Sequence, residues 1–163
     1  MLDILTIDKD TEGALRKKAA RVSDVKTSEM RRLVTDMISL MRVSDGVGLA
    51  APQVGRPLRL FVIEVDGRVS VFFNPVFTML SDETMTSEEG CLSVPDRYYV
   101  IDRSKRATME YIDQNGERKR IDAEGFLAAV LQHEFDHLEG ILFTDRVNEN
   151  DVDRQSSDKN YAL

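Results

Sequence analysis

The feature that most constrains this chain is a His-Glu-x-x-His motif at residues 133–137, inside the segment Gln-His-Glu-Phe-Asp-His-Leu-Glu-Gly. On a helix, residues four apart stand on one face, about a turn apart. His133 and His137 can therefore reach one metal ion together, with Glu134 beside them as a candidate proton acceptor. An ion of this kind usually takes a third protein ligand and leaves one position for water. We therefore expect a third ligand elsewhere in the chain.

The alternative to a metal site is a pair of histidines that hydrogen-bond within a core. A pattern of three fixed residues can arise by chance on any helix. The metal site is favoured because the flanking apolar residues predict a core-facing helix. The chain also places both of its histidines on that helix, at the spacing of the helical metal motif.

Apolar periodicity predicts helices near both ends and strands between them. We expect a short helix near residues 12–20, an amphipathic helix over 28–43 capped by Ser28, and a helix over about 123–138 opened by Asp122 and closed by Gly140. Strands are expected at 58–65, 69–73, 76–80, 98–101, 107–112 and 118–121, with turns at Asp66-Gly67 and Asn115-Gly116, and irregular loops at 44–55 and 88–95. This order predicts an α+β fold, with mostly antiparallel strands packed around a central C-terminal helix that carries the metal motif.

Length and charge narrow the organisation and the partners. The 163 residues fit one domain, expected at 1–147, followed by a polar, poorly ordered tail at 148–163. A net charge of -7 disfavours bare nucleic acid and anionic membranes as partners. No apolar run is long enough to span a bilayer, and the N-terminus lacks the features of a signal peptide, so we expect a cytoplasmic monomer.

The third ligand has several candidates. Asp136 and Glu139 point away from the face that His133 and His137 share, and a carboxylate from elsewhere in the chain is a further option. Cys91 is attractive because a thiolate binds a borderline-soft metal strongly. The structural alternative for a lone cysteine is a small buried hydrophobic residue.

Three blocks of sequence, in order, resemble the signature blocks of peptide deformylase. They are residues 46–53 (Gly-Val-Gly-Leu-Ala-Ala-Pro-Gln), 89–93 (Glu-Gly-Cys-Leu-Ser) and 132–137 (Gln-His-Glu-Phe-Asp-His). Further similarity at 15–19, 73–75 and 138–143 extends the resemblance over about 5–147. The resemblance implies an enzyme that removes the formyl group from the N-terminal formyl-methionine of new polypeptides and releases formate.

The resemblance also implies roles for individual residues. Cys91, His133 and His137 would be the metal ligands, and Glu134 the general acid and base. Gln53 and the backbone N–H of Leu92 would stabilise the oxyanion, as neutral donors suit the charge that develops there. Ligand types alone indicate zinc, whereas the resemblance implies one Fe(II) ion, with zinc, nickel or cobalt as possible substitutes.

Substrate contacts are expected from the glycine-containing block and the motif helix. Gly46 and Gly48 have no side chains, so the backbone at these two positions can approach an extended peptide closely. The candidate substrate-binding residues are Gly46, Val47, Gly48, Glu89, Arg97, Phe126, Ala129 and Val130. By resemblance Glu89 pairs with Arg103, and by proximity Asp136 is a possible hydrogen-bond partner of a ligand histidine.

Two other functions compete with the deformylase. A His-Glu-x-x-His peptidase would need a third histidine or glutamate ligand, which the sequence does not offer convincingly. A non-catalytic metal protein of this fold would be expected to lack Glu134 or Gln53. The segment after Pro95 is shorter than in many deformylases. The family's substrate contacts on that side are therefore not carried over, although Arg97 remains a candidate. The tail does not resemble the basic C-terminal helix linked to ribosome binding, so docking through it is expected to be weak or absent.

Overall fold

The computed structural model describes residues 2–147. Its helices and strands follow one another in this order: η1 (Ala14–Arg16), α1 (Ser28–Val43), β1 (Gly48–Ala50), η2 (Ala51–Val54), β2 (Leu60–Val65), β3 (Arg68–Leu80), β4 (Thr84–Cys91), β5 (Val94–Ser104), β6 (Arg106–Ile112), β7 (Arg118–Glu124), α2 (Phe126–Leu138) and η3 (Phe143–Arg146). The predicted tail at 148–163 lies outside the described residues. Within the described range, no helix is both long and apolar enough to cross a membrane.

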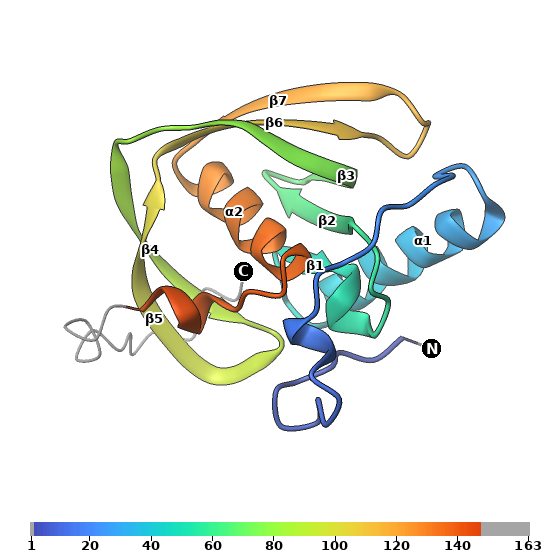
Figure 1. Ribbon diagram of the computed structural model, residues 1–163, viewed down its shortest axis with the longest axis horizontal. Helices are drawn as coiled ribbons and strands as arrows, with labels where there is room; N and C mark the ends of the chain where they lie inside the picture. Colours follow the sequence, from blue (N-terminus) through green and yellow to red (C-terminus); the bar gives the residue numbers. More distant parts are fainter. Residues whose placement is uncertain (1, 148–163) are drawn as a thin grey trace.

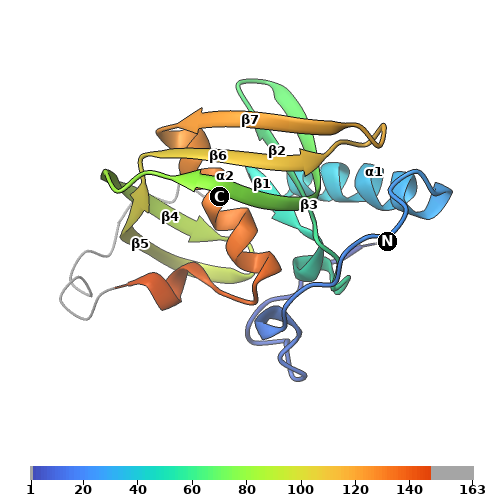
Figure 2. The same ribbon diagram turned by 45° about the horizontal axis from the view of Figure 1, so that its top comes forward.

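Two antiparallel sheets surround the second helix. The larger has the strand order β1-β2-β3-β6-β7, and the smaller pairs β4 with β5. Helix α2 lies between them, in contact with β1, β2, β5 and β7, whereas α1 lies at the far end beside β1 and β2 (Figure 1). Figure 2 shows β3, β6 and β7 side by side as a layer over α2. The predicted α+β arrangement around a central C-terminal helix is confirmed.

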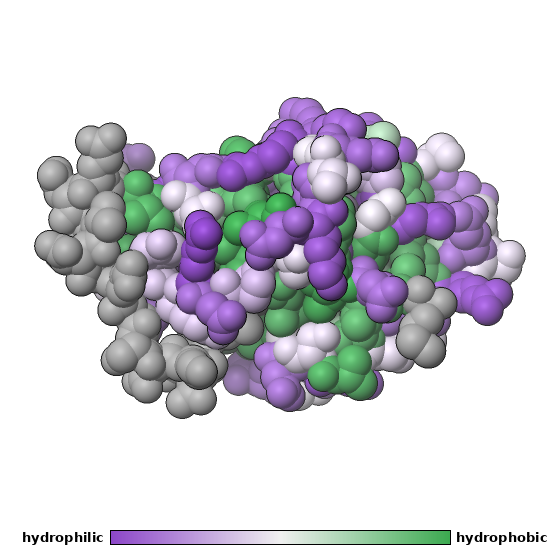
Figure 3. All heavy atoms as spheres, turned by 90° about the horizontal axis from the view of Figure 1, so that it is seen from below, coloured by the Kyte–Doolittle hydropathy of each residue, from purple (hydrophilic) through white to green (hydrophobic). Residues whose placement is uncertain are grey.

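Apolar side chains also reach the outside of the molecule. Figure 3 shows hydrophobic residues gathered between hydrophilic ones on one face. Among the larger exposed apolar residues of the described chain are Val43 at the end of α1 and Leu80 at the end of β3. Exposure of individual apolar residues such as these is ordinary for a folded domain.

Helix α1 is the amphipathic helix that the sequence predicted, but its cap differs. The Thr27 hydroxyl accepts a hydrogen bond from the backbone N–H of Met30 (3.2 Å), so Thr27 is the N-cap and Ser28 the first helical residue. The apolar stripe packs against β1, β2 and β3, and its fully buried members include Met37 and Met41. Burial of this one face fixes α1 on the sheet.

Helix α2 is buried on nearly all sides. Its apolar residues pack against Phe61, Phe72 and Met109 of the large sheet. Phe126, the first residue of the helix, is the exception and is 47% exposed. A helix enclosed by two sheets can bury polar side chains at low cost only where they find partners. The buried His133, Glu134 and His137 therefore need partners within the site.

The predicted start of α2 at Asp122 is also wrong. Strand β7 continues to Glu124, where it pairs with Arg106 of β6, and the Thr108 hydroxyl donates a hydrogen bond to Asp122. The helix begins only after Gly125, whose φ of 63° turns the chain out of the sheet. Cross-strand pairing thus outweighs the local tendency of Asp122 to cap a helix.

Strand β3 joins two strands that the sequence had separated at Asn74-Pro75. It runs from Arg68 to Leu80, with a register shift between Phe73 and Val76. At the shift Asn74 has a φ of 50°, and its side-chain amide exchanges two hydrogen bonds with the backbone of Val22, both 2.8 Å. The irregularity therefore accommodates Pro75, which cannot donate a ladder hydrogen bond.

Other predicted elements changed in extent. The expected loop at 88–95 is mostly the end of β4 and the start of β5, which are joined by a two-residue turn, and β5 is longer than the predicted strand at 98–101. The expected loop at 44–55 contains β1 and η2, and the expected helix at 12–20 is only the single turn of η1. Both predicted hairpins are present, joining β2 to β3 and β6 to β7.

Candidate metal centre

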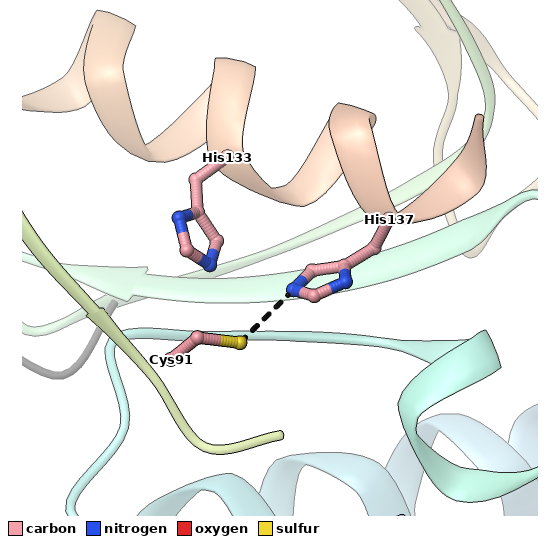
Figure 4. A group of neighbouring side chains, drawn as sticks. All are labelled: Cys91, His133 and His137. Atoms are coloured by element: carbon pink, nitrogen blue, oxygen red, sulfur yellow. Dashed lines mark hydrogen bonds between the residues drawn. The ribbon is translucent and has the colours of Figure 1, made fainter. Parts of the chain in front are cut away.

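The motif helix and the end of β4 bring three potential ligands together. His133 and His137 lie one turn apart on α2, and Cys91 is the last residue of β4 (Figure 4). Their ligand atoms all lie within 4.8 Å of one another, and the Cys91 Sγ is 3.3 Å from the His137 Nε2. None of the three residues is more than 4% exposed.

The donor set fits a divalent metal ion. One thiolate and two imidazoles match the preferences of borderline-soft metals. Among the described residues, the His133 Nε2 is buried and has no hydrogen-bond partner. An unpartnered buried imidazole nitrogen is costly unless something occupies its lone pair or its proton. The cluster of Cys91, His133 and His137 is therefore a potential metal-binding triad.

The other ligand candidates are engaged elsewhere. Asp136 pairs with Arg103 and Arg146, and Glu139 pairs with Lys18 and Arg59. Each carboxylate thus has two cationic partners away from the histidines. Of the candidates that the sequence left open, Cys91 is the one beside both imidazoles.

A buried carboxylate orients the first histidine. The His133 Nδ1 lies 2.8 Å from the Glu89 Oε2, and Glu89 also accepts two hydrogen bonds of 2.8 Å from Arg103. Burial alone raises the pKa of Glu89, but the hydrogen bonds from Arg103 and His133 outweigh it and lower this pKa to about 2. An ionised Glu89 accepts a hydrogen bond from the His133 Nδ1–H group, which favours the tautomer whose Nε2 lone pair can bind a metal.

The expected role of Asp136 as a histidine partner is therefore wrong. Its carboxylate lies 2.7 Å from the Arg103 Nη1 and 2.6 Å from the Arg146 Nε. The sequence did predict the pairing of Glu89 with Arg103, and the structure contains it. The result is an alternating row of charges, Glu89, Arg103, Asp136 and Arg146, in which each buried carboxylate has a cationic neighbour.

Replacing Arg103 by methionine is expected to lower the free energy of unfolding by about 3–5 kcal/mol, because one partner of a buried ion pair would be lost. Arg103 is 3% exposed and bonds both Glu89 and Asp136. Urea denaturation of the two proteins measures the difference. Arg120→Met is the matched control, since its pair with Asp122 is exposed and should contribute less than about 1 kcal/mol. Equal losses in the two variants would contradict the prediction.

Gln53 points its amide donors toward the triad. The backbone N–H of Ala50 donates to the Gln53 Oε1 (2.8 Å), which fixes the orientation of the amide group. The Gln53 Nε2 then lies 3.5 Å from the Cys91 Sγ and 3.2 Å from the Ser93 Oγ. A donor held in place beside the site suits stabilisation of a developing negative charge. The backbone N–H of Leu92 is the other predicted oxyanion donor. Leu92 is the first residue of the two-residue turn that joins β4 to β5.

Glu134 is fully buried and lies against the backbone of β1. Neither of its carboxylate oxygens has a hydrogen-bond partner among the described residues. Burial raises the pKa of Glu134 to about 7, which is the range in which a carboxyl group can both take and give a proton near neutral pH. A buried carboxyl group with a displaced pKa is a common mark of a functional site.

The predicted substrate residues other than Glu89 lie at three elements, β1, α2 and β5. Gly46, Val47 and Gly48 lie on or just before β1, and Ala129 and Val130 are fully buried in α2. Phe126 and Arg97 are both exposed, at the start of α2 and on β5 respectively. The expectation for Gly48 was close approach to a substrate, but the direction in which a side chain would point from Gly48 is occupied by the Glu134 side chain.

Comparison with known proteins agrees with this geometry. The sequence model of the family described as "Polypeptide deformylase" matches residues 1–153. The chain belongs to this deformylase family. A peptide deformylase of Treponema pallidum (strain Nichols) is 47% identical over 138 residues, which is 85% of each chain.

Solved deformylase structures share the fold. One from Synechococcus elongatus, in complex with actinonin, gives a TM-score of 0.87 at 37% identity and covers 99% of this chain and 87% of its own. Another, a Met-Ala-Ser-bound class I type b deformylase from Acinetobacter baumannii, gives 0.85 at 32% identity and covers 90% of this chain and 98% of its own. Deformylases are metallohydrolases, which is consistent with the triad.

Sequence reasoning missed some residues of this deformylase site. Ser93, whose hydroxyl oxygen accepts a hydrogen bond from Gln53, lies within the deformylase-like block at residues 89–93. Its place in that block is the signal that could have identified it. Arg146 gave none, because a single arginine after the motif helix has no distinctive pattern. Its partner Asp136 was noticed, but with the wrong contact.

Proposed function

We propose that this chain removes the formyl group from the N-terminal formyl-methionine of nascent polypeptides and releases formate. The observation that carries this proposal is the buried Cys91, His133 and His137 triad beside an unpartnered Glu134. Membership of the deformylase family supports the same reaction.

We propose that Cys91, His133 and His137 bind one divalent metal ion. The expected ion is Fe(II), with zinc, nickel or cobalt as possible substitutes. When bound, such an ion acts as a Lewis acid and lowers the pKa of water. Glu89 serves the same site by holding the His133 ring in the tautomer that binds metal.

Glu134 is the proposed general acid and base. It takes the proton of the attacking water and passes it to the leaving amine, a role that its pKa near neutrality supports. The Gln53 amide and the backbone N–H of Leu92 donate to the carbonyl oxygen as it gains negative charge. Because Ala50 orients the Gln53 amide in advance, little reorganisation is needed during the reaction.

The proposed binding site of the substrate peptide is the free edge of β1. β1 is an edge strand of the large sheet and pairs with β2 on one side, so an extended peptide can add to its other side. Gly46, Val47 and Gly48 would contact its backbone. Val47, Phe126, Ala129 and Val130 would contact the methionine side chain, and Arg97 completes the proposed set. Glu89 is left out of it, because its buried carboxylate is already bonded to His133 and Arg103. A crowded site would exclude acyl groups larger than formyl.

The proposed setting is the cytoplasm, where a monomeric enzyme meets new polypeptides. No direct nucleic-acid site and no membrane contact are proposed. Docking to the ribosome through residues 148–163 is expected to be weak or absent. The substrate is therefore recognised through its own formyl-methionine end.

Formate release from formyl-Met-Ala-Ser by metal-loaded, anaerobically prepared protein tests this function. We expect formate in amounts equal to the free amine formed, and no reaction with acetyl-Met-Ala-Ser. Analysis of the fragments formed from an unformylated peptide tests the alternative peptidase, which would cut an internal bond. Absence of formate would rule out the deformylase, and cleavage within the peptide would favour the peptidase.

A further inference from the structure

Gly48 occupies a place where a side chain would collide with Glu134. A Cβ atom built on Gly48 would lie 2.7 Å from the Glu134 Cδ and 2.9 Å from its Cγ, and it would also overlap a carboxylate oxygen. These separations are well inside van der Waals contact. The missing side chain of Gly48 therefore forms the space that the Glu134 carboxyl group fills.

The backbone conformation does not demand glycine at this position. Gly48 is not among the residues of positive φ, and it pairs regularly with Ile63 of β2. An alanine could adopt this extended conformation without strain. The requirement for glycine at position 48 is therefore one of space, and the residue that takes the space is Glu134.

Packing is also what holds Glu134 in position. Its two carboxylate oxygens have no hydrogen-bond partner among the described residues, so no hydrogen bond from these protein groups fixes the carboxyl group. The surface of β1 at Gly48 is one wall of the slot around it. An added methyl group would push the carboxyl group out of that slot.

We propose that Gly48 is a positioning residue, which places the Glu134 carboxyl group for proton transfer by leaving room for it against β1. This inference rests on the proposed role of Glu134. It differs from the expected role of Gly48 as a close contact for the peptide backbone, because the contact that requires glycine is made within the protein.

The first test is kinetic. Gly48→Ala is expected to lower kcat by at least about 10²-fold, the lower end of the effect of a positioned proton-transfer group, with KM changed by less than about threefold. The metal content should remain one ion per chain, because the three atoms nearest to an added Cβ at Gly48 all belong to Glu134 and none to the triad. A kcat within threefold of that of the wild type would overturn the proposal, and so would a loss confined to KM.

The second test is a double-mutant cycle read by urea denaturation. Gly48→Ala is expected to lower the urea midpoint of the wild type, and to lower it much less in a Glu134→Ala background, where the colliding atoms are absent. The control pair is Gly46→Ala in the same two backgrounds. The three atoms nearest to a Cβ at Gly46 belong to the Leu92 side chain and the Gly48 carbonyl group, and none of them to Glu134, so its effect should not depend on residue 134. Equal losses for Gly48→Ala in both backgrounds would overturn the proposal.

The cycle also separates this proposal from the proposed function. If Gly48→Ala alone fails to fold, recovery of soluble protein in the Gly48→Ala, Glu134→Ala double variant supports the proposal, and failure to recover it overturns it. If the wild type releases no formate, the proposed function fails, while the urea cycle still decides whether Gly48 accommodates Glu134.

Discussion

Glu134→Gln is expected to lower kcat for formate release by about 10²–10⁴-fold, the usual contribution of a positioned general acid and base. Glutamine has nearly the same shape as glutamate, so it fits the space beside Gly48. It cannot take up the proton of the attacking water. Because Glu134 belongs to no hydrogen bond or ion pair among the described residues, the substitution should leave the fold intact.

Single-turnover and steady-state measurements of formate release check this prediction, alongside metal analysis of the same samples. Metal content should be unchanged, since the triad consists of other side chains. Glu110→Gln, an exposed position on β6, is the matched control and should keep wild-type kcat. A Glu134→Gln variant with kcat near that of the wild type would remove Glu134 from the mechanism.

Loss of Cys91 is expected to weaken metal binding by more than about 100-fold, which exceeds the 10–100-fold typical of losing an outer partner of a ligand. Cys91→Ala removes the single sulfur donor and leaves two imidazoles on one helix. Activity should fall with metal content. The small change in buried volume should by itself have only a modest effect on stability.

Competition with a chelator measures the metal affinity of both proteins. A ligand that binds only the folded state stabilises it, so adding the metal should raise the urea midpoint of the wild type and leave that of Cys91→Ala almost unchanged. Wild type stripped by the chelator should lose activity and regain it when metal is returned. Retention of one tightly bound ion by Cys91→Ala would show that Cys91 is not a ligand.

Local patterns predicted α1 and the two hairpins. The stripe of α1 was found because helical periodicity is visible within a few residues, and the hairpins because Asp66-Gly67 and Asn115-Gly116 are turn signals. Local patterns failed where a sheet imposed its own pairing. Asp122 has the chemistry of a helix cap, yet it belongs to β7 because its neighbours hydrogen-bond to β6. Asn74-Pro75 has the chemistry of a break, yet β3 continues through it.

The residues of the site also divide into those that local patterns predicted and those that they did not. Spacing on one helix was enough to place His133, His137 and Glu134 together, because an α-helix fixes residues four apart wherever it lies. The resemblance supplied Cys91 and Gln53, and the pairing of Glu89 with Arg103. Nothing in the sequence separated Glu89 from Asp136 as the partner of His133, since Asp136 lies on the same helix and Glu89 is 44 residues away.

The sequence by itself thus determined the chemical groups and their order along one helix, because both depend on local geometry. Only the tertiary structure decided which groups face one another. It set Glu89 against His133, turned the Gln53 amide toward Cys91, and placed Glu134 in the space above Gly48. These contacts depend on how β1 and β4 pack around α2, and the physical reason is that packing between distant segments is fixed by the whole core rather than by any short pattern.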